Sequence, residues 1–374
     1  MKQIVLFLVA VCLGVVAWAQ NVSEQQFYVG TFTSEGAEGI YLCSFNTEDG
    51  SIKLKNTFRG VDNPSFLKLS RSREHLYVVS RTTEAVEKTG GFAIAYKVDR
   101  NGELKLLNKQ PANGNGPCHV DVSPDEKYIA IATYGGGTTS LYPLSKNGFL
   151  KPAATIIKNQ GTGGDPKRQD KPHAHSIKFS PFGKQVFSAD LGTDQLNIYN
   201  LKNGGLEPAK QAFVKLPSAS GPRHFVFHPT QEAIYVINEL NSTISVIKKA
   251  DCSWKVVQNI STLPENYMGE SYCADIHFSK DGKFLYGSNR GHNSIAVFQV
   301  NADNQELEMK GCVSVEGNWP RNFSLSPNGK WMLVGNQKSN DITVFRINAE
   351  TRMPEFTGKK FNLPSPVCIE FLSE

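Results

Sequence analysis

Several signals of enzyme chemistry and of particular protein classes are absent from this sequence. It contains no nucleophile elbow, no HExxH metal motif and no phosphate-binding loop. Its seven cysteines include no pair at the two-residue spacing of a zinc knuckle or redox site, and they are too sparse for a disulfide scaffold. No long basic run accompanies the small net charge of +5, so nothing indicates nucleic-acid binding. A moderate excess of positive charge fits a local site for an anion.

The N-terminal segment MKQIVLFLVAVCLGVVAWAQ has the features of an export signal. Lys2 precedes an apolar run that ends at Val16, and a small-x-small triplet follows at residues 17–19. We therefore expect residues 1–19 to be a signal peptide that is cut off before Gln20. A lipoprotein signal at Cys12 is disfavoured because Val11 stands where a small residue is required.

The rest of the chain has no apolar run of roughly 18 residues, the length that a membrane span needs. The mature protein is therefore expected to be exported, either periplasmic or secreted, without a membrane anchor. Its six remaining cysteines are expected to be mostly buried thiols. A disulfide between Cys43 and Cys368 is conceivable in an oxidising compartment, but strand neighbours rarely meet disulfide geometry without strain.

Seven similar segments recur along the chain at intervals of about 50 residues, which indicates a repeat architecture. They are NPSFLKLS, GPCHVDVS, HAHSIKFS, GPRHFVFH, CADIHFS, WPRNFSLS and PVCIEFLS, and they end at Ser70, Ser123, Ser180, His228, Ser279, Ser326 and Ser373. A turn and a second apolar run follow each of the first six, and then a third run and another turn. The chain is also rich in turn formers, with 32 glycines and 19 prolines. Each unit is therefore predicted to hold three or four short strands.

Four-stranded units of this length are typical of a β-propeller. Seven of them predict an all-β, seven-bladed β-propeller that forms a single domain over residues 20–374. The seventh segment has almost no chain after it, whereas residues 26–62 hold strands with no such segment before them. The simplest closure pairs the C-terminal strand with the N-terminal strands, which leaves only short, protected sheet edges.

Propeller geometry predicts which residues meet at the channel. The first strand of each blade lines the channel and the second runs antiparallel to it, so the start of the first and the end of the second share one face. The expected inner ring is Ser65, Cys118, His175, Arg223, Ala274, Arg321 and Cys368. The expected outer ring is Arg81, Tyr134, Leu191, Glu239, Arg290 and Gln337.

These rings are not evenly polar. The third, fourth and fifth repeats contribute His175, Arg223, Glu239 and Arg290, with His173 and His224 close by. A carboxylate, two guanidiniums and imidazoles at one channel mouth can hold an anion and move a proton. The same residues could instead be structural salt bridges that close the channel.

Other polar residues have simpler interpretations. Asp190 and Asp194 could bind a metal, but turn aspartates that accept backbone N–H groups are the favoured reading. His228 occupies the position where most of the other segments end in serine, so it is expected to bond a turn.

Several motifs resemble one known family. GPRHFVFHP, YVINEL, FLYGSNRGHNSIAVF, WPRNFSLSPNGKWMLVGNQ, PHAHS and ADLGTD are similar to segments of the lactonase family of seven-bladed propellers, which contains bacterial 6-phosphogluconolactonases and fungal carboxy-muconate cyclases. The resemblance runs from Tyr28 to the final strand. The cyclase branch implies an active site of a histidine, two arginines and a glutamate. By motif these are His175 or His173, Arg223, Glu239 and Arg290.

The resemblance implies a hydrolase that opens a lactone with water, which needs a general base, an oxyanion stabiliser and groups that orient the ring. The candidate catalytic residues are His175, Arg223, Glu239 and Arg290, and the candidate substrate-binding residues are His173, His224, Arg321, Tyr134 and Gln337. Either Glu239 or His175 is the base. An arginine beside Glu239 would lower the pKa of its carboxyl and so weaken it as a base. The scheme requires no metal and no cofactor.

Three points stay open at this level. The 6-phosphogluconolactonases act on a cytoplasmic metabolite, so the export signal favours another sugar-derived lactone. The reverse chemistry, a cycloisomerase that forms a lactone from an unsaturated dicarboxylate, would use the same arginines. A non-catalytic propeller that binds a sugar or a protein is the third reading.

Overall fold

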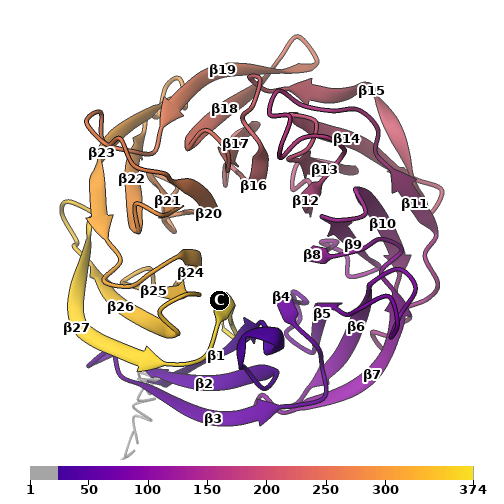
Figure 1. Ribbon diagram of the computed structural model, residues 1–374, viewed down its shortest axis with the longest axis horizontal. Helices are drawn as coiled ribbons and strands as arrows, with labels where there is room; N and C mark the ends of the chain where they lie inside the picture. Colours follow the sequence, from indigo (N-terminus) through magenta and orange to yellow (C-terminus); the bar gives the residue numbers. More distant parts are fainter. Residues whose placement is uncertain (1–23, 374) are drawn as a thin grey trace, which may run out of the picture.

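The computed structural model describes residues 24–373, and the expected signal peptide at residues 1–19 lies outside them. The chain folds into seven four-stranded antiparallel sheets. Figure 1 shows these sheets as blades around a central axis, in chain order around the ring. The predicted seven-bladed β-propeller is confirmed, and the described chain forms one ring.

Each blade runs from the axis outward through four strands in sequence order, apart from the closing blade. The innermost strands are β4 (Pro64–Leu69), β8 (Pro117–Val122), β12 (Ala174–Phe179), β16 (Pro222–Phe227), β20 (Tyr272–Phe278), β24 (Pro320–Leu325) and β28 (Pro366–Phe371). The second strands are β1 (Glu24–Thr31), β5 (His75–Arg81), β9 (Tyr128–Thr133), β13 (Gln185–Asp190), β17 (Ala233–Asn238), β21 (Phe284–Arg290) and β25 (Trp331–Asn336).

The two outer layers complete each blade. The third strands are β2 (Ile40–Asn46), β6 (Gly91–Val98), β10 (Thr138–Pro143), β14 (Gln195–Lys202), β18 (Thr243–Ala250), β22 (Ser294–Val300) and β26 (Asp341–Ile347). The outermost are β3 (Ile52–Phe58), β7 (Leu104–Pro111), β11 (Thr155–Lys158), β15 (Gly205–Lys215), β19 (Ser253–Ser261), β23 (Leu307–Ser314) and β27 (Pro354–Asn362). A 3-10 turn, η1 (Thr33–Glu35), follows β1. No helix within residues 24–373 has the length and apolar character that crossing a membrane requires.

The ring closes as the sequence predicts, because the C-terminal strand β28 pairs with β1 and becomes the innermost strand of the first blade. The pairing places Val29 opposite Ile369 and Gly30 opposite Cys368. Gly30 has no room for a side chain, since a Cβ there would lie 2.5 Å from the carbonyl oxygen of Pro64 in the next blade. The close approach of blades at the axis therefore requires glycine at this point.

The hydrophobic core lies between the blades. The buried apolar residues form seven clusters, each of which joins neighbouring sheets. One example is Trp331 of β25, whose ring lies 5.4 Å from that of Phe45 in β2. The cysteines at positions 43, 118, 252, 273, 312 and 368 are free, so no disulfide links Cys43 to Cys368.

A β-bulge recurs where the innermost strands begin. In five blades the ladder between the two inner strands skips one residue, and these residues are Ser65, Cys118, His175, Arg223 and Arg321. A bulge takes a residue out of the regular alternation and re-aims its side chain. The skipped residues are members of the predicted inner ring, so the bulges set what the channel mouth presents.

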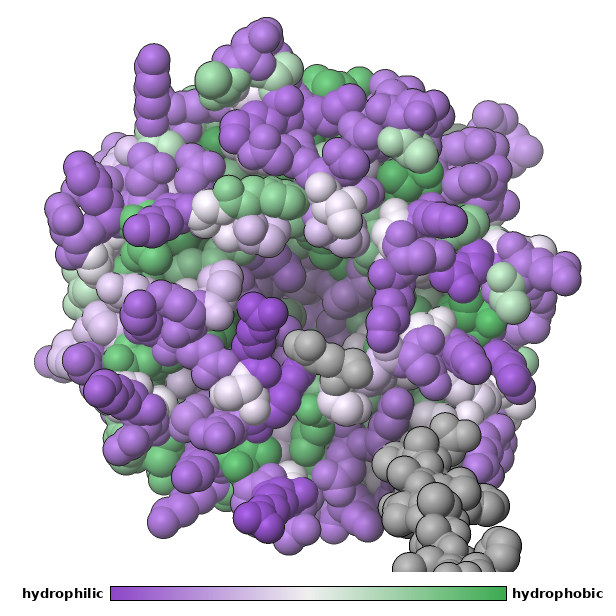
Figure 2. Space-filling model, turned by 180° about the vertical axis from the view of Figure 1, so that it is seen from behind, coloured by the Kyte–Doolittle hydropathy of each residue, from purple (hydrophilic) through white to green (hydrophobic). Residues whose placement is uncertain are grey.

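One face of the ring is hollowed at its centre (Figure 2). Figure 2 shows it from behind, where hydrophilic side chains dominate the face and a depression opens at the centre. The candidate site lies where the inner strands begin and the second strands end.

Candidate active site

Glu239 is the centre of the polar cluster at the channel mouth. It follows β17 directly, and its side chain is 7% exposed. Its Oε2 lies 3.0 Å from Arg223 Nε and 2.8 Å from Arg290 Nη2. Its Oε1 accepts a hydrogen bond of 2.7 Å from Arg168 Nη2. Three guanidiniums therefore share this buried carboxylate.

The arginines decide the ionisation of Glu239. Burial by itself would raise the pKa of the carboxyl, but Arg290, Arg223 and Arg168 outweigh that effect and lower the pKa to about 2. Glu239 is therefore ionised at any physiological pH. Both oxygens of this carboxylate are engaged by arginines, so Glu239 is placed to hold the guanidiniums and has no free oxygen for a water proton.

His175 has the opposite character. Burial, and then the neighbouring Arg223 and His224, lower the pKa of its imidazole well below the ordinary value. Its Nε2 lies 4.0 Å from Glu239 Oε2, which is too long for a hydrogen bond. Its buried Nδ1 has no hydrogen-bond partner within the described part of the chain. His175 is therefore a neutral imidazole with lone-pair capacity beside a cationic cluster.

Arg223 and Arg290 are anchored by backbone carbonyl groups of β20. Arg223 Nη1 donates to the carbonyl oxygen of Ala274, and Arg290 Nη2 donates to that of Cys273 at 2.8 Å. Burial and the nearby Arg290 lower the pKa of Arg223 to about 10. Within residues 24–373, Arg223 Nη2 and Arg290 Nη1 have no hydrogen-bond partner, which leaves one donor nitrogen on each guanidinium for a ligand.

His224 lies one layer deeper than the other predicted residues. Its Nδ1 is 2.7 Å from Asp275 Oδ1, and its Nε2 is 3.4 Å from Arg223 Nη1. Burial and Arg223 lower the pKa of His224 to about 4, so the imidazole is neutral. The carboxylate partner places the proton on Nδ1, and Nε2 is then the acceptor that faces Arg223. This arrangement makes His224 a support for Arg223.

Tyr134 and His173 form one wall of the mouth. Their rings stack with centroids 4.3 Å apart, and His173 Nδ1 lies 2.8 Å from the carbonyl oxygen of Tyr134. The Tyr134 ring also meets His175 edge-on at 5.5 Å. Both predicted residues therefore border His175.

Arg321 of β24 and Gln337, which follows β25, lie on another part of the rim. Arg321 Nη1 lies 3.5 Å from Gln337 Oε1, at the limit of a hydrogen bond. Gln337 Nε2 donates to both carboxylate oxygens of Glu35 at 3.0 Å. Neither residue contacts Glu239, so the predicted substrate-binding residues divide into two groups.

Arg168 is the member of the site that sequence reasoning missed. It lies in the connection between β11 and β12, at residues 159–173, and its Nη2 bonds both Glu239 and the Tyr134 hydroxyl. Gln169 anchors this connection, because its Nε2 donates to Leu191 O at 2.7 Å and to Asp194 Oδ1 at 2.6 Å. The available signal was the length of the connection, since long loops in compact domains are usually functional.

Asp190 and Asp194 are turn aspartates, as the favoured reading predicts. Asp190 Oδ1 accepts from the amides of His173 and Gly192, and Asp194 Oδ1 accepts from that of Gly221. His228 Nδ1 likewise accepts from two turn amides, those of Thr230 and Gln231. Among residues 24–373, no three histidines, cysteines or carboxylates are grouped so that they could hold a metal ion.

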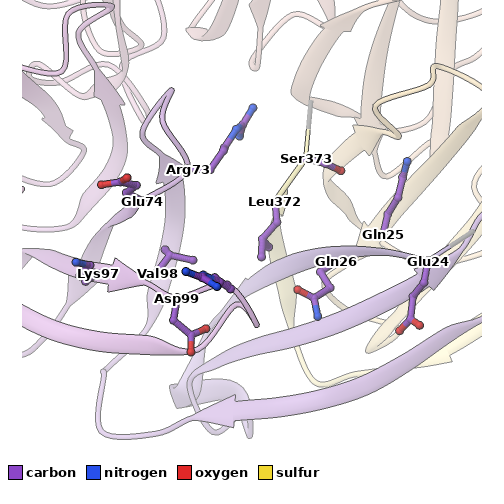
Figure 3. A pocket seen from close by; sticks show the side chains of 11 residues that line it. Glu24, Gln25, Gln26, Arg73, Glu74, Lys97, Val98, Asp99, Leu372 and Ser373 are labelled. Carbon is purple, nitrogen blue, oxygen red and sulfur yellow. The ribbon is translucent and has the colours of Figure 1, made fainter. Parts of the chain in front are cut away.

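A cavity of about 960 Å³ lies beside the closing strands at the ends remote from the mouth. Figure 3 shows its lining, where the acidic Glu24, Glu74 and Asp99 lie among basic Arg73 and Lys97. Acidic and basic side chains are mixed there and no histidine contributes, so the mouth remains the candidate site.

Comparisons with known proteins agree with this fold. The family model "Lactonase, 7-bladed beta-propeller" matches residues 26–371. A 6-phosphogluconolactonase of Bacillus subtilis is 34% identical over 93% of this chain and 98% of its own. The structure of a periplasmic gluconolactonase of Pseudomonas aeruginosa is 29% identical, with a TM-score of 0.88 over 93% of this chain and 99% of its own. A candidate 6-phosphogluconolactonase of Bacteroides fragilis is 33% identical, with a TM-score of 0.87 over 94% and 99%. This chain belongs to the lactonase family of seven-bladed β-propellers.

Proposed function

We propose that the protein is a lactone hydrolase whose active site is the mouth cluster of His175, Arg223, Glu239 and Arg290. The observation that carries the proposal is a neutral, partly unpartnered imidazole beside two guanidiniums that a buried carboxylate holds. Ester hydrolysis needs this pair of functions, a proton acceptor for water and fixed positive charge for the oxyanion. The names of the relatives agree with it.

In the proposed mechanism His175 accepts a proton from water, and the water oxygen forms a bond to the lactone carbonyl carbon. The carbonyl oxygen becomes an oxyanion, which Arg223 Nη2 and Arg290 Nη1 stabilise. When the tetrahedral intermediate collapses, the bond to the ring oxygen breaks, and the imidazolium of His175 returns the proton to that oxygen. The product is the open hydroxy acid.

Glu239 supports this chemistry without exchanging a proton. Its low pKa keeps it ionised, and its two oxygens fix the orientation of Arg223, Arg290 and Arg168. Pre-oriented donors stabilise an oxyanion more effectively than mobile ones, because they do not have to reorganise during the reaction.

The direct test is the rate of acid release from glucono-δ-lactone, measured against the spontaneous rate. His175→Asn should reduce the catalysed rate roughly a hundredfold or more, since it removes the proton acceptor. His228→Asn is the matched control, because His228 bonds a turn outside the site. An equally active His175→Asn variant would remove this residue as the base.

The same preparation tests the two other readings. Formation of a lactone from an unsaturated dicarboxylate, without lactone hydrolysis, would identify a cycloisomerase; the names of the relatives do not favour this. Saturable binding of sugars or aldonic acids without turnover would identify a non-catalytic binding protein.

We also propose that the enzyme is exported and acts on a sugar-derived lactone outside the cytoplasm. The support is the signal-like segment at residues 1–19, together with the periplasmic location in the name of the Pseudomonas aeruginosa relative. N-terminal sequencing of the protein from fractionated cells should give Gln20 as the first residue. An intact Met1 on cytoplasmic protein would contradict export.

A further inference from the structure

A pair of arginines on the rim of the mouth is not used by the proposed chemistry. Arg81 ends β5 and Arg321 stands near the start of β24, in the two blades that flank the closing blade. The ring of Phe32, which follows β1 in the closing blade, packs against both arginines. Each guanidinium carbon lies 5.2 Å from the centroid of the Phe32 ring. The two guanidiniums therefore contact one buried ring from the blades on either side of it.

These guanidiniums have few polar partners. Arg81 Nε donates to the carbonyl oxygen of Pro117 at 3.0 Å, and Arg321 Nη1 meets Gln337 Oε1 at 3.5 Å. Within residues 24–373, no carboxylate forms an ion pair with either arginine. Arg223, Arg290 and Arg168, by contrast, all bond Glu239.

The nearby carboxylate of Glu35 is already engaged. Its oxygens accept two bonds from Gln337 Nε2, and Oε2 also accepts one from the Ser365 hydroxyl at 2.6 Å. Gln337 thus stands between Glu35 and Arg321, with its amide oxygen toward the arginine and its amide nitrogen toward the carboxylate. The remaining N–H groups of Arg321 are left for another acceptor.

The surroundings make an anionic partner favourable here. Burial lowers the pKa of both guanidiniums, and Arg223, Arg290 and Arg81 lower that of Arg321 further. Like charges with little solvent and no counter-charge are costly, and an anion bound by both guanidiniums would relieve that cost. Guanidinium groups present paired N–H donors that match the oxygens of phosphate and carboxylate.

We propose that Arg81 and Arg321, which both pack against Phe32, form a second anion subsite that binds a phosphoryl or carboxylate substituent of the substrate. The proposal rests on the proposed function, because it assigns the reacting carbonyl to Arg223 and Arg290 and the substituent to this pair. The enzyme then holds a substrate that carries negative charge away from the lactone ring, and the arginine pair discriminates against an uncharged one.

The test uses three open-chain acids that differ only at the terminal carbon: gluconate, 6-phosphogluconate and glucarate. Calorimetry of the mature protein should show that at least one of the two doubly anionic acids binds about tenfold or more tightly than gluconate. Preference for 6-phosphogluconate would identify a phosphoryl substituent, and preference for glucarate a carboxylate. Equal affinity for all three acids would overturn the proposal.

The variants Arg81→Gln and Arg321→Gln test whether these two residues cause the preference for a doubly anionic acid. Each should bring the ratio of affinities, charged acid over gluconate, close to one. Arg321→Lys, which keeps the charge and loses the paired donors, should give an intermediate ratio. Arg59→Gln is the matched control, since Arg59 is exposed and already pairs with Glu38. Glutamine variants that fold and keep the full ratio would place the substituent elsewhere.

Lactonase activity is measured on the same proteins, so that the two proposals can fail separately. Lactone turnover without any change of selectivity in the arginine variants would disprove the subsite alone. The expected binding pattern without turnover of any lactone would disprove the proposed function and leave the anion subsite standing.

Discussion

The two ends of the channel are built from the same inner strands but carry opposite kinds of polar cluster. At the mouth, Glu239 is shared by three arginines, while Arg81 and Arg321 have no carboxylate partner within the described chain. Toward the other end, Lys68 of β4 pairs with Glu370 of β28 at 3.0 Å. The mouth therefore has an excess of positive charge, whereas cations and anions are matched at the far end.

The far end shows what a structural ion network in this fold looks like. Asp121 accepts from the amide of Phe179 at 2.9 Å, and its attraction to Lys178 opposes the effect of burial on both groups. Asp275 accepts from His224 and His277. The cavity among these side chains is only about 60 Å³, which is room for about two waters.

A column of rings lies between the two ends. From Tyr134 the column passes through His175 and His224 to His119 and Phe66, with successive centroids 5.5, 5.5, 5.4 and 4.2 Å apart. These rings link the mouth to the far end along the channel. The salt-bridge reading of the channel fits the far end, and the excess of arginine at the mouth fits anion binding.

The largest expected effect comes from removing the strand that both ends share. Deletion of residues 365–374 takes away β28, which pairs with β1 and supplies Cys368 and Glu370 to the two ends. Ladder bonds and core contacts of the closing blade would be lost together, so the ring should unfold at a much lower temperature. Thermal unfolding followed by circular dichroism measures this. A truncated protein that melts like the full-length one would contradict the structural role of the closure.

The next largest effect is expected from a substitution at the mouth that should change lactone turnover but not the melting temperature. Arg290→Lys keeps the charge that faces Glu239 but loses the guanidinium geometry, so lactone turnover should fall roughly a hundredfold while the melting temperature changes little. Arg346→Lys is a matched control, because Arg346 and Arg290 each lie 5.4 Å from a tryptophan ring and only Arg290 is at the mouth. An active but destabilised Arg290→Lys variant would favour the structural reading of the mouth.

The seven repeated segments made the composition of the mouth largely predictable from the sequence. A fixed offset from each repeated segment locates the start of the inner strand and the end of the second strand, which is why the spacing of the repeats groups His175, Arg223, Glu239 and Arg290. The offset works because every blade has the same strand order. The β-bulges that reorient the inner residues could not be predicted, because no sequence pattern indicated them.

Residues outside the repeat could not be found in this way. Arg168 lies in a connection that is longer than the corresponding ones between the other blades, and Phe32 comes before the first repeated segment. Each reaches the mouth only through tertiary contacts, such as the bonds of Gln169 to Asp194 and Leu191 O. The packing of Arg81 and Arg321 against Phe32 joins residues 240 positions apart in the sequence, which no local pattern encodes.

A smaller effect concerns His224, which lies between the two ends. Its pKa is about 4 in the folded protein and about 6.5 when unfolded, so the unfolded chain takes up a proton first as the pH falls below 6.5. The stability that depends on neutral His224 is therefore complete above pH 6.5 and is lost as the pH falls toward 4, by about 2 kcal/mol between pH 7 and pH 5.

Comparison with His224→Gln isolates this contribution. The amide cannot be protonated, so the variant should lose less stability than the wild type between pH 7 and pH 5 in urea unfolding. His175 and His119 also have lowered pKa values, mainly through burial and in part through His224, so they add a trend of the same sign in both proteins, somewhat smaller in the variant. Identical pH dependence of the two proteins would show that His224 takes up a proton in the folded state as easily as in the unfolded one.

The smallest effect tests the far end alone. Glu370→Gln removes the charge that pairs with Lys68, and a lysine side chain that is 38% exposed keeps part of its hydration. We therefore expect a loss of about 1 kcal/mol in the free energy of unfolding, with lactone turnover unchanged because Glu370 pairs with Lys68 and has no contact with the Glu239 cluster among the described residues. Urea unfolding and the rate of acid release measure the two quantities on one preparation. A loss of turnover without a loss of stability would mean that the far end takes part in the reaction, and the division between a structural end and a reactive end would not hold.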